Sequence, residues 1–463
     1  MSNYKHLYWI IFVATNGGLL FGLNMAGISG AVDSIQTIFS LNENALGIVV
    51  SSLIIGALIG SSATGFFIEK YGRKKVLILS SILFAISSLG SCVSSDYILL
   101  IAFRIIGGIG MGIISVLGPI YISEISIPEK RGMLVSLHQF SIVIGILMAY
   151  IFDYFLIDVA NGWRYMLLIP FFFSILFLIL IVAYLPESPR WLIARGKKLD
   201  NSQIKSEKVD SLKVKSEKLE SEAYGILKSV HGADLAKKEV EEIKNSSSFK
   251  GRKISFKEIF KGRIGKIVLL GVTLAIFQQI VGINAVINYA PIIFQKTGVS
   301  GNTALLQSVF IGVVNFLATI IALYFIDSKG RKTLLIWGAV GMTVTLAYIS
   351  YAFAFNENNL GILLAILAYI AFFAASFAPV LGVITSEMFS NNFRAVAMSL
   401  TGLVNWVGTF LVVQFAPYIL NQFGGAILFG IFAICSFLSL IFVKIWIPET
   451  KGKSLEEIER ELT

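Results

Sequence analysis

The chain has 463 residues, of which 56% are hydrophobic and 14% charged, and its formal net charge is +10. Soluble proteins carry roughly 25% charged residues, so this composition excludes a water-soluble globular protein. The positive charge does not indicate a nucleic-acid partner, because 20 of the 38 Lys and Arg lie between residues 190 and 266 and the rest cluster in short loops.

Apolar runs of about 20 residues or more make up most of the chain, and each is long enough to cross a bilayer core of ~30 Å as a helix. Lipid offers the backbone no hydrogen bonds, so each run is predicted to be helical. The twelve predicted spans are 7–32, 44–68, 75–95, 98–121, 133–157, 163–185, 264–294, 302–326, 333–355, 360–386, 395–421 and 424–447. The first is too long for the apolar core of a signal peptide and is predicted to be a retained span.

Basic residues mark alternate loops between the spans. One set of loops carries its Lys and Arg in 69–75, 122–132 and 327–332 and at Arg394. The opposite set has only Arg164 and Lys296. Because positive residues are retained on the cytoplasmic side, both termini and the long middle loop are predicted to be cytoplasmic, in a multi-pass protein of the cell membrane.

The middle loop divides the chain into two halves. The predicted parts are a six-helix bundle at 1–185, a connecting loop at 186–263, a second six-helix bundle at 264–447 and a cytoplasmic tail at 448–463. The loop carries Lys-Ser-Glu-Lys twice, at 205–208 and 215–218, and such mixed charges predict a partly helical segment. The run 246–248 of three serines predicts a flexible joint. The loop is either a tether, or a latch over the cytoplasmic mouth or a contact with anionic headgroups.

Short motifs recur in the same order in the two halves. Gly72-Arg73-Lys74 returns as Gly330-Arg331-Lys332 after 258 residues, Ser123-Glu124 as Ser386-Glu387 after 263, and Pro186-Glu187 as Pro448-Glu449 after 262. The chain is therefore predicted to contain two tandem copies of one membrane unit. Parallel repeats of this kind are typical of secondary transporters, whose solute site lies between the halves.

The loop motifs are more specific than the spans. The segment after span two reads Gly65-x3-Glu69-x2-Gly72-Arg73-Lys74, and its counterpart reads Asp327-x2-Gly330-Arg331-Lys332. The sequence PESPRWL begins at Pro186 and PETKG begins at Pro448. With Arg104-x2-Gly107-Gly108 and Gln278-Gln279-x3-Gly282-x-Asn284, these motifs resemble the sugar porter family of the major facilitator superfamily. The resemblance implies an all-α membrane protein of twelve transmembrane helices in two six-helix bundles, with a cytoplasmic helical loop between them.

Acidic and basic residues stand together at the cytoplasmic ends of the spans. The expected pairs are Glu69 with Arg73, Glu124 with Arg131, Asp327 with Arg331, and Glu387 with Arg394. Glu187, Arg190 and Glu449 are expected to join the same salt-bridge network. Such pairs can tie the two halves together in one conformation and break in the other, as alternating access requires. The alternative is that the basic residues only anchor the helix ends at the headgroups.

A sugar is neutral and rich in hydroxyls, so its site needs amide and indole groups, which donate and accept without charge. The amides within the spans that match the family's binding positions are Gln139, Gln278, Gln279, Asn284, Asn288, Asn315 and Asn405. On a regular helix, Gln278, Asn284 and Asn288 lie within roughly 120° of one another, and Gln279 joins them only if the helix is irregular near Gly282. Helix–helix hydrogen bonding is the alternative role for a membrane amide.

Aromatic positions and two departures from the family pattern concern the choice of sugar. Trp406 resembles the family's aromatic wall, and Phe21 is a weaker candidate for the opposite side. Gly382 stands where the family usually has a tryptophan, which could enlarge the pocket. Asn288 stands where the family commonly has a tyrosine. The sugar could be a hexose, a pentose or a polyol.

Asn24 and Arg104 occupy the family's coupling position. Proton-linked members typically have an aspartate at the position of Asn24, and facilitative members have an asparagine, which cannot change its charge. No carboxylate lies near the middle of a predicted span, whereas intramembrane carboxylates usually mark a proton relay. The sequence therefore favours passive uniport over sugar–proton symport.

Other function classes fit the sequence less well. A non-transporting nutrient receptor would be expected to have a long cytoplasmic extension, whereas the tail at 448–463 is short. No nucleophile–base pair, metal cluster or phosphate loop is recognisable, so we expect neither an enzyme nor a cofactor or metal site. The expected partners are a small sugar and the lipid bilayer, and the protein is expected to work as a monomer.

Overall fold

A computed structural model describes residues 2–127, 130–202, 209–246, 262–355, 359–389 and 393–451, and these ranges are helical without strands. The helices of the first half are α1 (Ser2–Ala26), η1 (Ser29–Ala31), α2 (Val32–Ile38), α3 (Glu43–Tyr71), α4 (Arg73–Val93), α5 (Tyr97–Ile125), α6 (Arg131–Leu156) and α7 (Gly162–Tyr184). Those of the middle loop are α8 (Pro189–Ser202), α9 (Val209–His231) and α10 (Ala233–Ser246). Those of the second half are α11 (Gly262–Ile280), α12 (Ile283–Gln295), α13 (Gly301–Lys329), α14 (Arg331–Ala354), α15 (Asn359–Ala375), α16 (Phe377–Met388) and α17 (Arg394–Trp446).

The twelve predicted spans are present. Eleven described segments are long and apolar enough to cross a membrane, and the last of them, Val396–Trp446, has 51 residues. At 1.5 Å per residue a straight helix of that length would measure about 76 Å, far more than one crossing. The chain instead turns at Gly424, whose φ is +84°, so α17 contains spans eleven and twelve.

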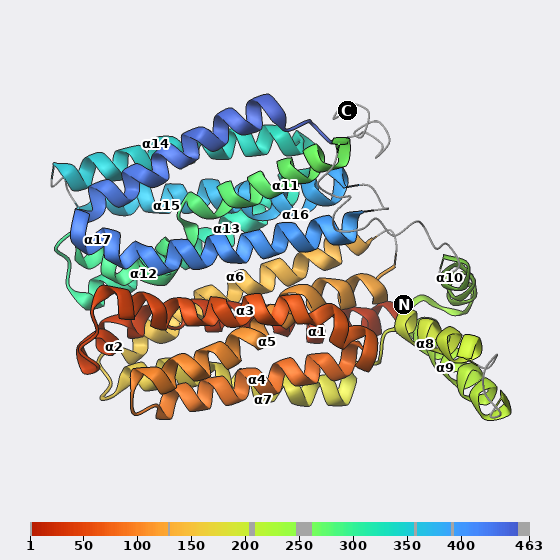
Figure 1. The fold of residues 1–463 in the computed structure, drawn as a ribbon. Helices are drawn as coiled ribbons and strands as arrows, with labels where there is room; N and C mark the ends of the chain where they lie inside the picture. The colour runs from red at the N-terminus through yellow and green to blue at the C-terminus, as the bar shows by residue number, and fades with distance from the viewer. Residues whose placement is uncertain are drawn as a thin grey trace.

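The two halves lie side by side (Figure 1), with the red-to-yellow helices of the first half below the green-to-blue helices of the second. Across the boundary α3 packs against α17, and α6 packs against α13. The start of α1, the end of α17 and helices α8–α10 lie at one end of the bundle (Figure 1). We call this the cytoplasmic end, following the prediction from Lys and Arg in the loops, and the opposite end the outer end.

Glycines allow the helices of the first half to approach closely. Gly56 of α3 meets Gly108 of α5, and Gly112 of α5 lies against the backbone of Ala57. A Cβ built on Gly60 would lie 2.2 Å from the carbonyl oxygen of Ile109. Backbones this close leave no room for a side chain. Helices associate this way in lipid because small residues permit extensive van der Waals contact.

Three of the predicted spans are interrupted, one of them at Gly282, where the sequence analysis allowed for an irregularity. In span one, helix α1 ends at Ala26, and the chain continues through η1 and α2 to Ile38. Span seven is divided into α11 and α12, and span ten is divided into α15 and α16 at Ser376. Interrupted helices leave backbone groups without partners inside the helix, and such groups are tolerated only where protein or a cavity surrounds them.

The middle helices form a small unit with its own apolar cluster, which includes Leu192, Ile193 and Leu227. The unit contacts the first half: Trp191 Nε1 donates to the carbonyl of Glu69 at 3.1 Å, and a ring nitrogen of His231 lies 2.9 Å from the carbonyl oxygen of Ile125. The described parts of the loop are largely helical, in agreement with the prediction of a partly helical segment. α10 ends at Ser246, and the rest of the predicted serine joint lies outside the described residues.

Candidate functional site

Four amide side chains form one chain of hydrogen bonds within the second half. Asn405 Nδ2 donates to Gln278 Oε1 at 2.7 Å, and Gln279 Nε2 donates to the same oxygen at 3.4 Å. Asn284 Nδ2 donates to Gln279 Oε1 at 2.6 Å, and Gln278 Nε2 donates to the carbonyl of Phe377 at 2.8 Å. Candidate residues from two distant spans therefore meet, and we call these four the amide group.

The break in span seven brings Gln279 into the amide group. Gly282 has a φ of +93°, a conformation that suits glycine, and it separates α11 from α12 near the middle of the span Ile264–Gln295. The irregularity on which Gln279 depended is therefore present. At the other break, the carbonyl of Phe377, the first residue of α16 after Ser376, accepts from Gln278.

The remaining candidate amides are placed differently. Asn288 Nδ2 donates to the carbonyl of Asn284 at 2.8 Å, one turn farther along α12. Asn315 is buried on α13, and Gln139 is exposed on α6. No hydrogen bond between described residues joins either of these two to the amide group.

Thr409 completes the amide group and was missed by the sequence analysis. Its Oγ1 lies 3.5 Å from Asn284 Nδ2 and donates to the carbonyl of Asn405 at 2.9 Å. Thr409 follows Asn405 by one helical turn, and this spacing could have identified it.

The aromatic candidates lie at the boundary between the halves. The rings of Phe21 and Trp406 have their centroids 6.1 Å apart, so they contact each other instead of standing on opposite sides of an open space. Gly382 lies on α16, and a Cβ built there would meet no other atom within 4 Å. Glycine at this position therefore leaves the space beside α16 unfilled.

Arg104 and Asn24 are both buried but do not hydrogen-bond to each other in the described residues. Arg104 Nε donates to the carbonyl of Val49 at 2.9 Å, and its Nη2 donates to that of Val50 at 3.1 Å. Asn24 Nδ2 donates to the carbonyl of Leu20 in its own helix at 2.9 Å. The guanidinium is therefore held by the backbone of α3.

The repeated loop motifs of the first half converge on one cluster at the cytoplasmic end. Arg73 binds Glu124 through two parallel hydrogen bonds of 2.8 and 2.9 Å, and Ser188 Oγ donates to Glu124 at 2.5 Å. Glu187 accepts from the backbone N–H groups of Arg73 and Lys74 at the start of α4. Burial raises the pKa of the Glu187 carboxyl, and the N–H groups around it oppose that shift.

The second half repeats this cluster residue for residue. Arg331 Nη2 donates to Glu387 at 2.9 Å, and Thr450 Oγ1 donates to the other oxygen of Glu387 at 2.6 Å. Glu449 accepts from the N–H groups of Arg331 and Lys332 at the start of α14. The three pairs of repeated motifs are therefore the parts of one structural device, formed once in each half.

The expected pairings inside this network were wrong in detail. Arg73 pairs with Glu124 instead of Glu69, which is exposed and lies 3.9 Å from Lys198. Arg331 pairs with Glu387, and the side chain of Asp327 lies outside the described residues. The reason is geometric, because each arginine starts a helix whose neighbour in space is the end of another helix rather than the preceding turn.

The last two basic candidates close helix ends instead of forming the expected ion pairs. Arg131 Nε donates to the carbonyl of Ser123 at 3.0 Å, and Arg394 Nε donates to the carbonyl of Phe389 at 2.9 Å. Arg190 is exposed on α8. In the described residues, the Arg73–Glu124 pair lies within the first half and the Arg331–Glu387 pair within the second, so neither of these two pairs joins the halves as expected.

Comparison with known proteins fits this arrangement. A model of the family described as "Sugar (and other) transporter" matches residues 10–462. The D-xylose-proton symporter of Escherichia coli is 36% identical, with 99% of this chain and 96% of the relative covered. The arabinose-proton symporter of Bacillus subtilis is 35% identical, with 96% and 92% covered. The inward-open structure of the xylose transporter XylE from E. coli has a TM-score of 0.83 at 34% identity and covers 98% and 99%.

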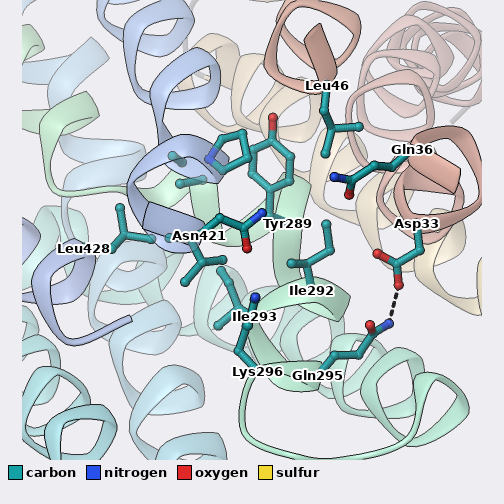
Figure 2. Close-up of a pocket in the computed structure, with 14 residues that line it drawn as sticks. Asp33, Gln36, Leu46, Tyr289, Ile292, Ile293, Gln295, Lys296, Asn421 and Leu428 are labelled. Atoms are coloured by element: carbon teal, nitrogen blue, oxygen red, sulfur yellow. Dashed lines mark hydrogen bonds between the residues drawn. The ribbon is translucent and has the colours of Figure 1, made fainter. Parts of the chain in front are cut away.

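The chain is a sugar porter of the major facilitator superfamily. In this sugar porter a cavity of about 360 Å³ lies between the halves at the outer end (Figure 2). Asp33, Gln36 and Leu46 of the first half line it, opposite residues of α12 and α17. Tyr289 also lines the cavity, while Asn284 on the same helix belongs to the amide group. The helix α12 of the sugar porter therefore contributes to both.

Proposed function

We propose that this sugar porter carries a monosaccharide, either a hexose, a pentose or a polyol, by alternating access around the amide group. The observation that carries the proposal is the chain of hydrogen bonds from Asn405 through Gln278 and Gln279 to Asn284. These groups are uncharged, and each can donate or accept, which is what the hydroxyls of a neutral sugar require. The backbone carbonyl of Phe377, beside the break at Ser376, is a further acceptor next to them.

When a sugar binds, the amide side chains exchange hydrogen-bond partners; the sugar does not fill an apolar pocket. The sugar hydroxyls replace amide–amide bonds and water, so the net gain depends on matching every polar group. Each unmatched buried group would lose about 1–3 kcal/mol. Trp406 beside Asn405 offers an indole face to the sugar ring, and Gly382 leaves room on the α16 side. Asn288, Asn315 and Gln139 are proposed as contacts made as the halves move.

Uptake into proteoliposomes tests this function. We expect saturable flux of at least one radiolabelled sugar among xylose, arabinose and glucose, which the relatives' names mention. Unlabelled competitors should then rank the hexoses, pentoses and polyols. Purified protein that gives no saturable flux for any monosaccharide or polyol would contradict the proposal.

We propose that the two arginine–glutamate clusters act as gating elements, each holding the cytoplasmic helix ends of one half as a rigid unit. The Arg73–Glu124 pair is bidentate, and such pairs are geometrically specific. Each cluster is proposed to fix how the helices of its half meet. A rocking motion between halves needs such rigid units. The exposed residues Glu69 and Arg190, along with Asp327, Arg131 and Arg394, are proposed to act at the rims of these clusters.

Thr450→Ala is expected to lower the sugar turnover rate roughly 2- to 10-fold, because one net hydrogen bond of about 0.5–1.5 kcal/mol to Glu387 is lost. The KM should stay unchanged, since Thr450 lies at the cytoplasmic end and not in the amide group. Initial-rate uptake at several sugar concentrations measures both parameters. Thr450→Ser keeps the hydroxyl and should restore the rate; equal loss in both variants would argue against this role.

We propose that transport is a facilitative uniport. Asn24 cannot take up or release a proton, and Arg104 is satisfied by the carbonyls of Val49 and Val50 without a carboxylate. Among the described residues, no carboxylate hydrogen-bonds to this arginine.

Sugar–proton symport is the second candidate, because two of the relatives are named proton symporters. The group that could carry the proton is Asp153 of α6, which is 1% exposed and accepts from the N–H of Gly30 at 2.9 Å. An external pH electrode separates the modes: uniport predicts no sugar-induced alkalinisation in intact cells. Alkalinisation that a protonophore abolishes, and that Asp153→Asn removes, would overturn uniport and assign the proton to Asp153.

A further inference from the structure

The hydrogen bonds that join the two halves, as far as the described residues show, all lie toward the outer end. They link Asp33 with Gln295, Glu43 with Asn421, Asp158 with Asn302, Tyr150 with the carbonyl of Ile287, and Gln414 with both Ser51 and the carbonyl of Asn44. The described ion pairs, by contrast, do not join the two halves. They lie within one half or within the middle helices, apart from Lys198 with Glu69, which joins a middle helix to the first half. The outer end is therefore the closed end in this conformation.

Gln414 makes the deepest side-chain bridge between α17 and α3. Its Oε1 accepts from Ser51 Oγ at 2.8 Å, and its Nε2 donates to the carbonyl of Asn44 at 3.1 Å. The side chain is buried, with 8% exposed. Ser51 lies about 12 Å along α3 from its start at Glu43. The bridge therefore reaches well below the outer rim.

Gly47 allows the two helices to meet at this bridge. A Cβ built on Gly47 would lie 2.4 Å from the carbonyl oxygen of Gln414 and 2.9 Å from its Nε2. The backbones of α3 and α17 can therefore touch only while residue 47 has no side chain. We call Gln414, Ser51, Asn44 and Gly47 the outer clamp.

Three bonds above the clamp share one chemistry. Each joins a carboxylate of the first half to an amide of the second: Asp33 to Gln295 (Figure 2), Glu43 to Asn421, and Asp158 to Asn302. The first and second halves thus contribute different groups, unlike the two cytoplasmic clusters, which repeat each other. These rim bonds are more exposed than the clamp, so water competes with them and each contributes less.

We propose that Gln414 is a positioning residue that holds the outer end closed, and that it must release Ser51 and Asn44 before sugar can reach the amide group from outside. This inference rests on the proposed alternating access. Gln414 acts through the conformational equilibrium, because its bridge exists only while α3 and α17 are together. Removing the Gln414 side chain destabilises the state with the outer end closed by the free energy of the lost hydrogen bonds, and so raises the population of the outward-open state.

The test is the accessibility of the outer cavity in the full-length protein. Cys92 and Cys435 are first replaced with serine, and Ile292, which lines the cavity, is changed to cysteine. A membrane-impermeant maleimide is then added from outside. We expect Gln414→Ala to raise the labelling rate about 5- to 30-fold. Gly47→Leu, which wedges the same helices apart, should raise it in the same direction.

The matched control is Gln36→Ala. Gln36 is also an amide that lines the outer cavity, but it donates to the carbonyl of Leu41 within the first half. Its loss should leave the labelling rate unchanged. Labelling that stays at the parent rate in folded Gln414→Ala and folded Gly47→Leu proteins overturns the proposal. If neither variant folds, the rim double variant Asn421→Ala with Gln295→Ala decides in the same assay.

Transport gives an independent readout that a purely structural role would not produce. An outward shift should lower the KM for sugar presented outside and raise the KM for sugar presented inside, whereas poor folding would lower the maximal rate from both sides. Labelling does not require a transported sugar. The two proposals can therefore fail separately. If the outer clamp is right but the proposed cargo is wrong, Gln414→Ala changes the labelling rate but no sugar flux is found.

Discussion

Gln278→Ala should raise the KM for sugar about 10- to 100-fold. Gln278 is the hub of the amide group: it donates to the carbonyl of Phe377 and accepts from both Asn405 and Gln279. Its removal leaves buried donors without their acceptor, at about 1–3 kcal/mol for each unsatisfied group. A tenfold change corresponds to about 1.4 kcal/mol. Uptake at graded concentrations of the best-transported sugar measures the effect.

Gln307→Ala is the control for this prediction. Gln307 is an amide on α13 whose buried oxygen has no hydrogen-bond partner among the described residues, so its loss removes no described bond of the amide group. It should leave the KM near the parent value. Equal KM values for Gln278→Ala and the parent protein would remove the amide group as the sugar site, whereas a fall in maximal rate alone would indicate a conformational role.

Gly60→Leu should prevent the first half from packing. A Cβ at residue 60 would lie 2.2 Å from the carbonyl oxygen of Ile109 and within 2.9 Å of two more backbone atoms of the same residue. Backbone cannot rotate away as a side chain can, so α3 and α5 must separate along their whole contact. Overpacking typically costs about 1–3 kcal/mol, and more where helices must part. We expect a large loss of monodisperse protein in detergent and a lower thermal midpoint.

Gly65→Leu provides the matched control on the same helix. A Cβ built on Gly65 meets no other atom within 4 Å. The same change in helix propensity, roughly 0.8–1 kcal/mol in favour of leucine, is introduced without a clash. Size-exclusion profiles and thermal midpoints should therefore match those of the parent protein or improve on them. If Gly60→Leu were as stable as Gly65→Leu, the close α3–α5 contact would be wrong.

The sequence predicted the composition of the two arginine–glutamate clusters but not the pairing inside them. The repetition of the loop motifs predicted two equivalent units, and Arg73, Glu124 and Glu187 do meet in one unit as Arg331, Glu387 and Glu449 do in the other. The pairing inside each unit was not predictable. An arginine at a helix start bonds to whichever helix end lies beside it, and that neighbour is distant in the sequence.

The amide candidates show the same division. Their residue type indicated a site for a neutral, hydroxyl-rich solute, and Gln278, Gln279, Asn284 and Asn405 are brought together. Periodicity assumes an unbroken helix, so it could not place Gln279 without knowing the conformation of Gly282. Gln414 escaped notice because an amide in a span has the same sequence signature whether it binds solute, joins helices or closes a gate.

The sequence by itself determined the number of spans, the duplication and the uncharged character of the candidate site, because hydrophobic length, repeated motifs and residue type are local properties. Only the tertiary structure decided which partners each polar group takes. Helix breaks at Gly282 and Ser376 depend on packing that surrounds and satisfies the freed backbone groups. The closed outer end depends on contacts between α3 and α17, which are more than 350 residues apart at Ser51 and Gln414. No local pattern encodes an interface between halves that must also come apart.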